Sequence, residues 1–363
     1  MKPKYAGRFF FSVVLFYILT GFAAAGLIRF LPEVGFAWSA VLGAAIIGLP
    51  LLVFVLCTMV PVRAQLGLRR VRPATCLLSL LLMVVVYPLV TLVNALTMLF
   101  TDNVVETISG DILEEPLWLM LLLVGVLGPL VEELAFRGYI YRNLRESGRV
   151  RSAILLSAVL FGLMHMNFNQ ACYAALLGVF LAAADEAADS LWPSVLIHMG
   201  FNSLEVLILY GAEQFADDLT EEALEENLQS LSPLPDTTEW AQQFWAALFC
   251  VSVCAVCVAL AVLILRRIAR LEKTRGVGAG PGGVQTQGRL TGGGTWEPAA
   301  AACSAASPGG TAQAPAWQNP PEEAGAARAA AQPKQPDKNR SGKTSLLSVS
   351  MIAGMVITAV YIL

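Results

Sequence analysis

Six polar side chains that can do acid–base chemistry or donate hydrogen bonds stand in stretches of the sequence that are otherwise apolar. They are Glu132, Glu133, Arg137, His165, His198 and Asn202. The chain has only 2 histidines, and both belong to this set. Placing an ionisable side chain at bilayer depth costs about 2.5–3.5 kcal/mol on insertion scales, so each one needs either a partner or a functional reason.

The spacing of these residues divides them into groups. Residues four apart share a face of a helix, whereas adjacent residues point about 100° apart. Glu133 and Arg137 can therefore form an ion pair, and Glu132 is left without a partner close in sequence. The four-residue spacing recurs in two later segments, in the pairs Phe161–His165 and His198–Asn202. Three separate helices thus offer a free carboxylate, an imidazole, and an imidazole with an amide.

The chemistry best matched to these groups is hydrolysis by water that a glutamate activates. A carboxylate in a low-dielectric pocket is a stronger base than in water, and a nearby imidazole can hold a water molecule against it. Glu132 then deprotonates the water, while His198 and Asn202 donate hydrogen bonds to the oxyanion that develops on the carbonyl. The sequence has no recognisable serine or cysteine nucleophile motif and no HExxH motif. On the residues alone, a proton or ion pathway and purely structural polar contacts remain alternatives.

The composition requires a membrane to surround these residues. Of the 363 residues, 56% are hydrophobic and 14% are charged, with a mean hydropathy of +0.64. Soluble domains carry about 25% charged residues. The composition therefore excludes a soluble enzyme, a nucleic-acid binder and a disordered protein as descriptions of the whole chain.

The apolar runs predict an all-α, polytopic membrane helix bundle of about eight spans, because a span needs about 20 apolar residues and exposed backbone in lipid must be helical. The expected spans are 9–31, 35–61, 76–100, 117–136, 152–168, 171–184, 191–211 and 244–266. A further charge-free run, 344–363, predicts a ninth, C-terminal helix. The sixth span is short, so we expect it to be tilted, buried or broken.

The distribution of charge predicts the orientation. Basic residues cluster at the amino end and after the second, fourth and eighth spans, within 2–8, 63–72, 142–151 and 266–270. The intervening segments 102–115 and 213–239 are acidic and hold no lysine or arginine. Since cytoplasmic loops carry the excess of Lys and Arg, we expect a multi-pass protein of the cell membrane with a cytoplasmic amino terminus.

The chain divides into segments of different character. The organisation we expect is amino-terminal spans at 1–74, a catalytic core at 75–211, an acidic extracytoplasmic loop at 212–243, an eighth span with a basic end at 244–273, a disordered linker at 274–340 and a hydrophobic helix at 341–363. The linker is rich in Gly, Ala and Pro, so it cannot bury enough apolar surface to offset the cost of ordering.

The motifs together resemble those of the CPBP family, the CAAX prenyl protease and bacteriocin-processing (Abi) intramembrane proteins. Its EExxxR motif appears as Glu132-Glu133-xxx-Arg137, its FxxxH motif as Phe161 to His165, and its HxxxN motif as His198 to Asn202 after Ser190-Leu191-Trp192-Pro193. The resemblance covers roughly residues 75–211. One departure is Ala188-Asp189, where the family often has Thr-Gly; we expect it to change a loop rather than the chemistry.

The resemblance implies an intramembrane endopeptidase that depends on glutamate. Glu132 and His165 would activate the water, His198 and Asn202 would bind the oxyanion, and Glu133 with Arg137 would position the site. The expected partners are the lipid bilayer and a membrane-associated peptide or protein substrate, and no nucleic acid. With no eukaryotic targeting motif in the sequence, bacteriocin self-immunity or peptide maturation is expected rather than cleavage of prenylated tails.

Two alternatives accompany this hypothesis. No cofactor is expected, but Glu132, His165 and His198 could supply three ligands to zinc in a metal-dependent variant of the same hydrolase. The chain could instead be a non-catalytic immunity or scaffold protein that binds a peptide partner. Geometry sets one condition on the site: His198 lies nearer the cytoplasmic end of its span than His165, so the fifth helix must start deeper, tilt or end differently from 152–168.

Overall fold

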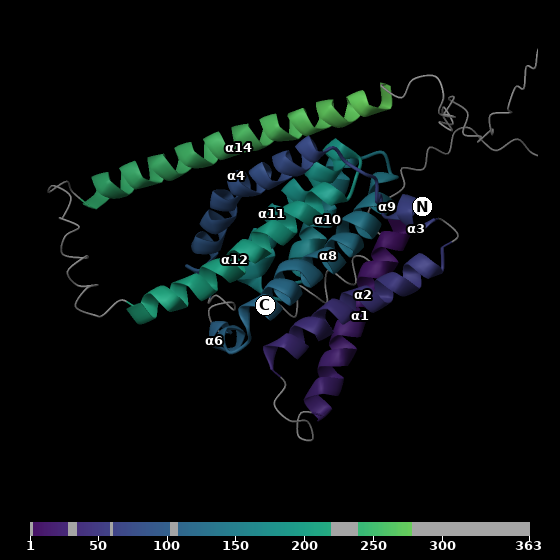
Figure 1. The fold of residues 1–363 in the computed structure, drawn as a ribbon, viewed down its shortest axis with the longest axis horizontal. Helices are drawn as coiled ribbons and strands as arrows, with labels where there is room; N and C mark the ends of the chain where they lie inside the picture. Colours follow the sequence, from purple (N-terminus) through teal and green to yellow (C-terminus); the bar gives the residue numbers. More distant parts are fainter. Residues whose placement is uncertain (1–2, 28–34, 59–60, 102–107, 219–238, 278–363) are drawn as a thin grey trace, which may run out of the picture. The chain divides into compact units, whose positions relative to one another are not determined.

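The computed structural model describes residues 3–277 apart from 28–34, 59–60, 102–107 and 219–238 (Figure 1). All regular structure in these described residues is helical, which confirms the predicted all-α membrane bundle. The longer helices are α1 (Pro3–Leu27), α2 (Phe36–Leu56), α4 (Pro73–Thr97), α10 (Val150–Leu163), α11 (Phe168–Ala188), α12 (Trp192–Asp218) and α14 (Glu239–Val277). The short ones include α3 (Val62–Gln65) and α6 (Ser109–Leu113).

The helical run that bears both glutamates changes its winding along its length. It comprises α7 (Leu117–Met120), the π-helical η1 (Leu121–Leu127), α8 (Gly128–Glu133), the π-helical η2 (Leu134–Tyr141) and α9 (Arg142–Arg145). Pro129 at the start of α8 has no N–H to donate and crowds the preceding turn, and the wider turns of η1 relieve this conflict. The two π segments flank α8 and therefore set the directions of its side chains.

Seven helices are long and apolar enough to cross a membrane within the described residues. The expected fifth span is wrong at its end, because α10 has 14 residues, or about 21 Å, against a hydrocarbon core of about 30 Å. Met166 takes a left-handed conformation and the Asn167 side chain caps α11, so the chain turns before residue 168. The expectation that the sixth span is short is also wrong, since α11 has 21 residues.

The helices that carry the motifs pack against one another in the middle of the bundle. Helix α10 packs along α11, and α12 contacts α11, α8 and η1. On one side α4 covers α11 and α12 and is itself packed against α14, while α1 and α2 pack on η2 and α8, respectively (Figure 1). The site residues therefore lie on helices that are packed against several other helices.

Close contact between α10 and α11 depends on a glycine. A Cβ on Gly162 would lie 2.3 Å from the backbone oxygen of Ala171, which cannot move without shifting α11. We expect Gly162→Ala to lower the free energy of unfolding by about 1–3 kcal/mol, the usual cost of overpacking. Gly211→Ala in α12 is the control, because nothing lies within 4 Å of its Cβ. Thermal unfolding in detergent micelles checks this, and equal melting temperatures for the two variants would contradict it.

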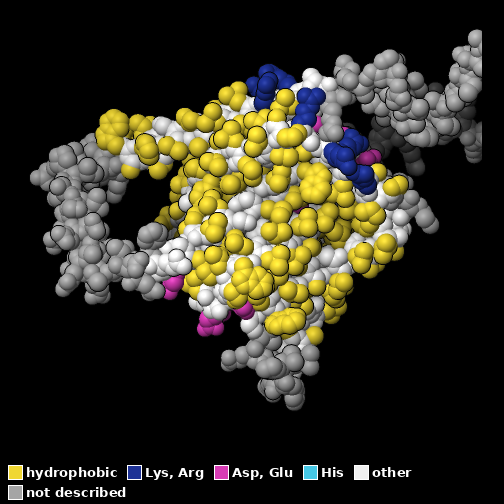
Figure 2. All heavy atoms as spheres, viewed as in Figure 1, with side chains coloured by type: hydrophobic (Ala, Val, Ile, Leu, Met, Phe, Trp, Pro, Cys, Tyr) yellow, Lys and Arg dark blue, Asp and Glu magenta, His cyan; other side chains and the backbone are white. Residues whose placement is uncertain are grey.

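Basic side chains are concentrated at one end of the bundle. Figure 2 shows lysine and arginine side chains gathered at one end of the visible face. At this end Asp189 pairs with Arg69 and lies near Arg142 and Arg145, and Arg145 also pairs with Glu186 at 2.6 Å. The cytoplasmic location of this end stays a prediction.

The remaining predicted segments lie partly or wholly outside the described residues. Helix α12 continues to Asp218 and α14 begins at Glu239, so both enter the expected loop 212–243, of which 219–238 is not described. Helix α14 ends at Val277, within the start of the expected linker 274–340. The rest of that linker and the helix expected at 341–363 fall outside the described residues.

Candidate active site

The Glu133–Arg137 ion pair expected from the sequence is present and completely enclosed. Arg137 Nη1 donates to Glu133 Oε1 at 2.8 Å, and both side chains are 0% exposed. The guanidinium also lies over the ring of Phe161, 4.1 Å from its centroid. Gly178 of α11 makes room for it, because a Cβ there would lie 3.1 Å from Arg137 Nη2.

His198 stands between the two glutamates. Its Nδ1 lies 2.8 Å from Glu133 Oε1, and since a carboxylate oxygen accepts, Nδ1 donates. Its Nε2 lies 3.8 Å from Glu132 Oε2. The Glu132 side chain is 25% exposed, in contrast to the enclosed Glu133. Two adjacent carboxylates thus have different environments: Glu133 is fixed by a cation and an imidazole, whereas Glu132 remains accessible beside the second nitrogen of that imidazole.

Phe161 brings the two imidazoles to one place. Its ring meets those of His165 and His198 edge to face, with centroid distances of 5.1 and 5.5 Å. His165 Nδ1 lies 3.0 Å from the backbone oxygen of Phe161. A carbonyl oxygen only accepts, so Nδ1 carries the proton and Nε2 of neutral His165 is left as the acceptor. This tautomer suits a base or a water-binding group.

Asn202 lies one turn beyond His198 on α12 and faces η1. Its Nδ2 donates to the backbone oxygen of Val124 at 3.3 Å, which leaves the second N–H of the amide for another acceptor. Direct contacts therefore join Glu132, Glu133, Arg137 and His198, and Phe161 links His165 to them. Asn202 joins the site through η1 rather than through a contact with the other predicted residues.

Asp185 of α11 is a buried acidic residue that the sequence reasoning missed. It is 3% exposed, and its two oxygens accept from the backbone N and the Oγ of Ser194, both at 3.0 Å. Its charge also acts on Arg137. Ser194 precedes His198 by one turn, so Asp185 ties α11 to the part of α12 that presents the imidazole. The signal in the sequence was a carboxylate one residue past the expected end of an apolar span.

The departure from the family at Ala188-Asp189 lies at the end of α11, and its effect on the loop stays a prediction. Asp189 adopts a left-handed conformation (φ 49°) that ends α11, a position at which glycine is usual. Its carboxylate pairs with Arg69, whose segment precedes α4. Asp189 therefore makes an ion pair at the end of the bundle, and the ion pair at Glu133 is made independently of it.

The metal-dependent alternative stays a hypothesis, and the grouping of the described side chains gives it no ready ligand set. Among the residues that the structure describes, no three His, Cys, Asp or Glu side chains are grouped so as to hold a metal ion. Each imidazole directs Nδ1 at an oxygen of the protein, His198 at Glu133 and His165 at a backbone oxygen, and this leaves Nε2 of each ring for other contacts. The expectation that no cofactor takes part stays a prediction.

Comparisons with known proteins support the family resemblance inferred from the motifs. Residues 114–204 match the family model described as Type II CAAX prenyl endopeptidase Rce1-like. The chain is 27% identical over 90 residues to "Putative membrane peptidase YdiL" of Bacillus subtilis (strain 168), over 25% of this chain and 37% of that protein. The chain thus aligns with little more than a third of that relative's length. No solved structure matches significantly. All six predicted site residues lie within 114–204, and the resemblance to the CPBP family is confirmed for this region.

Proposed function

We propose that this chain is an intramembrane endopeptidase in which Glu132 activates the water that cleaves a peptide bond. The observation that carries the proposal is the pairing of an accessible Glu132 carboxylate with His198 Nε2, 3.8 Å away, within an apolar bundle. The family match over 114–204 supports a membrane peptidase. Neither the substrate nor the chemical step follows from that match, so both are part of the proposal.

The different environments of the two glutamates assign the base. Glu133 holds Arg137 and His198 and has no exposed surface, so it cannot reach a substrate without losing both partners. Glu132 is accessible, and nothing closer than His198 pairs with it among the described ionisable groups. A base must be free to take a proton and to give it back. Glu132 therefore takes this part, and Glu133 positions His198.

The proposed reaction uses the groups as follows. A water held between Glu132 and Nε2 of His165 loses a proton to Glu132 as its oxygen attacks the carbonyl carbon of the substrate. The carbonyl oxygen becomes an oxyanion, which accepts hydrogen bonds from Nε2–H of protonated His198 and from the second N–H of Asn202. The C–N bond then breaks, and Glu132 returns its proton to the departing nitrogen. The negative charge of Glu133 stabilises the imidazolium of His198 throughout.

The substrate class that fits is a membrane-associated peptide or protein. The site lies in helices long and apolar enough to span the bilayer, and its polar groups are surrounded by apolar side chains such as Phe136 and Phe161. A substrate must therefore enter from lipid or from the membrane surface. Non-catalytic binding of such a peptide is the second hypothesis, and the same experiment separates the two.

Purified wild-type protein and the Glu132→Gln variant should be compared on a library of membrane peptides in water enriched in ¹⁸O. We expect the wild type to release products with one ¹⁸O in the new carboxyl group. The variant should be about 10²–10⁴-fold slower, because glutamine keeps the volume but cannot accept the proton.

Glu186→Gln is the matched control, since its side chain is 27% exposed but lies in the Arg145 ion pair. It should cleave as the wild type does. Equal rates for wild type and Glu132→Gln would refute the assigned base. A folded wild type that binds peptides and cleaves none would favour the immunity or scaffold hypothesis.

A further inference from the structure

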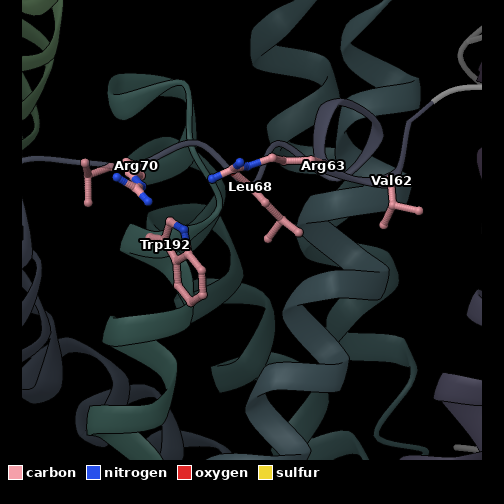
Figure 3. Close-up of a pocket in the computed structure, with 6 residues that line it drawn as sticks. Val62, Arg63, Leu68, Arg70 and Trp192 are labelled. Carbon is pink, nitrogen blue, oxygen red and sulfur yellow. The ribbon is translucent and has the colours of Figure 1, made fainter.

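An acidic residue that the proposed reaction does not use lies on the same helix as His198. Figure 3 shows the start of this helix, where Trp192 lines a pocket together with arginines of the segment between α2 and α4. Glu205 lies about 20 Å further along α12, within the candidate span Trp192–Gln214. It is one residue beyond the region 114–204 that matches the family model. An ionisable side chain at this depth needs a partner or a functional reason.

Glu205 lies on the face of α12 that carries the proposed oxyanion donors. Intervals of four and three residues join His198, Asn202 and Glu205, and residues at these intervals share one face of a helix. The hydroxyl of Tyr87 on α4 interacts with the Glu205 carboxylate, and the charge of Glu205 also acts on Tyr173 of α11. Both α4 and α11 pack against α12. The carboxylate therefore lies on the side of α12 that these two helices face.

Tyr173 connects the surroundings of Glu205 with the motif residues. It packs against the apolar cluster that contains Phe161 and against the cluster that contains Phe201. The ring of Phe201 in turn meets that of Tyr87, with centroids 5.3 Å apart. Tyr173 thus links Glu205 to Phe161, whose ring contacts both imidazoles.

The Glu205 carboxylate can accept a further ligand. The residue is exposed, and no cation of the described residues forms an ion pair with it. The Tyr87 hydroxyl is a neutral donor, so it satisfies one of the roughly four acceptor positions of a carboxylate and leaves the charge in place. A basic group beside Glu205 would offset this charge, and the rings of Tyr87 and Tyr173 would add cation–π attraction. These features favour a positively charged ligand.

The distance along the helix indicates which part of a substrate would reach Glu205. His198 and Glu205 are about 10.5 Å apart along α12, and an extended peptide beside the helix advances about 3.3 Å per residue. We propose that Glu205 binds a lysine or arginine side chain about three residues from the cleaved bond, so that cationic membrane peptides are the preferred substrates. This inference rests on the proposed function, because it takes the carbonyl under attack to lie beside His198.

A lysine scan of one membrane peptide tests the proposal. Lysine or glutamine is placed at each position in turn, and kcat/KM is measured for the wild type, Glu205→Gln and the control Glu213→Gln. We expect the wild type to prefer lysine about tenfold at about three residues from the cleaved bond, as one close charge pair would provide. Glu205→Gln should lose this preference, and Glu205→Lys should prefer glutamate at the same position. Glu213 is an exposed carboxylate further along α12, so Glu213→Gln should keep the preference for lysine.

Binding of the same peptides to the Glu132→Gln variant separates this proposal from the proposed function. Binding that favours lysine and is weakened in Glu132→Gln/Glu205→Gln, with no cleavage by the wild type, would refute the proteolytic function and leave the cation site in place. Binding with no preference for lysine would overturn the cation site.

Three results of the cleavage scan would also overturn it. They are a wild-type rate that does not depend on the position of the lysine, an undiminished preference in Glu205→Gln, and an equal loss in Glu213→Gln. If Glu205→Gln does not fold, Glu205→Asp takes its place: it keeps the charge, so it should favour lysine near the same position, and a folded Glu205→Asp without that preference would contradict the proposal.

Discussion

Arg137→Met is expected to lower the free energy of unfolding by about 3–5 kcal/mol, the usual cost of removing one partner from a buried ion pair. The change leaves the Glu133 carboxylate enclosed, with His198 as its remaining hydrogen-bond donor among the described groups. Methionine is apolar and flexible enough to keep contact with Phe161, so the loss reports the charge rather than the volume. Equilibrium unfolding in detergent micelles measures it.

The double variant Glu133→Gln/Arg137→Met separates charge pairing from packing. It removes both charges, so it should be markedly more stable than Arg137→Met alone, as expected when a buried pair is replaced as a unit. Arg145→Met is the matched control, because its ion pair with Glu186 is partly exposed and should contribute less than about 1 kcal/mol. If Arg137→Met costs no more than Arg145→Met, the enclosed pair is not what holds these helices together.

The enclosure of Arg137 accounts for an aromatic residue on α10 and a glycine on α11 at the points where these helices meet its side chain. Its guanidinium is covered by the Phe161 ring on α10 and approaches Gly178 on α11. Its Nε and Nη2, and the Oε2 of Glu133, have no hydrogen-bond partner among the described groups. Buried polar atoms normally have partners, so the cluster is only partly satisfied by protein groups. Arg137 thus contributes to packing, and through Glu133 it also positions His198.

Sequence spacing was sufficient for the contacts made within one helix. The four-residue interval predicted the Glu133–Arg137 pair, and hydropathy predicted the membrane bundle. Sequence spacing was insufficient to predict contacts between different helices. Nothing in the sequence indicates that His198 would use Nδ1 for Glu133 and turn Nε2 toward Glu132, because this depends on how α12 crosses α8. The link from Asp185 to Ser194 depends in the same way on the turn that joins α11 to α12.

The error at the fifth span has a local physical cause. The apolar run continues past Leu163, so a hydropathy window extends the helix to residue 168. A left-handed Met166 and the Asn167 cap end it earlier, and the amide of Asn169 donates to Asn94 and Thr97 of α4. The Nδ2 donors of Asn169 are thus satisfied by protein, as donors must be within an apolar bundle, whereas its Oδ1 has no partner among the described groups. The helix thus ends differently from 152–168, which is one of the three ways in which the two histidines could be brought to one site.

His198→Asn is expected to reduce cleavage about 10²–10³-fold while the protein stays folded. The amide nitrogen of asparagine can replace Nδ1 as the donor to Glu133, but nothing replaces Nε2, which faces Glu132 at 3.8 Å. The size of the loss is that of one donor to a developing oxyanion. Rates on a cleaved membrane peptide and unfolding in micelles should be measured on the same preparations.

His198→Ala distinguishes positioning from chemistry at this residue. It removes both nitrogens, so it should lose a similar factor in rate and, in addition, about 1–3 kcal/mol of stability, because the enclosed Glu133 loses a donor. Asn202→Ala provides a second comparison: if both side chains serve one oxyanion, the double variant His198→Asn/Asn202→Ala should be less impaired than the product of the two single losses. Cleavage by His198→Asn within tenfold of the wild type would mean that Nε2 takes no part, and the oxyanion would then have to be bound from another helix.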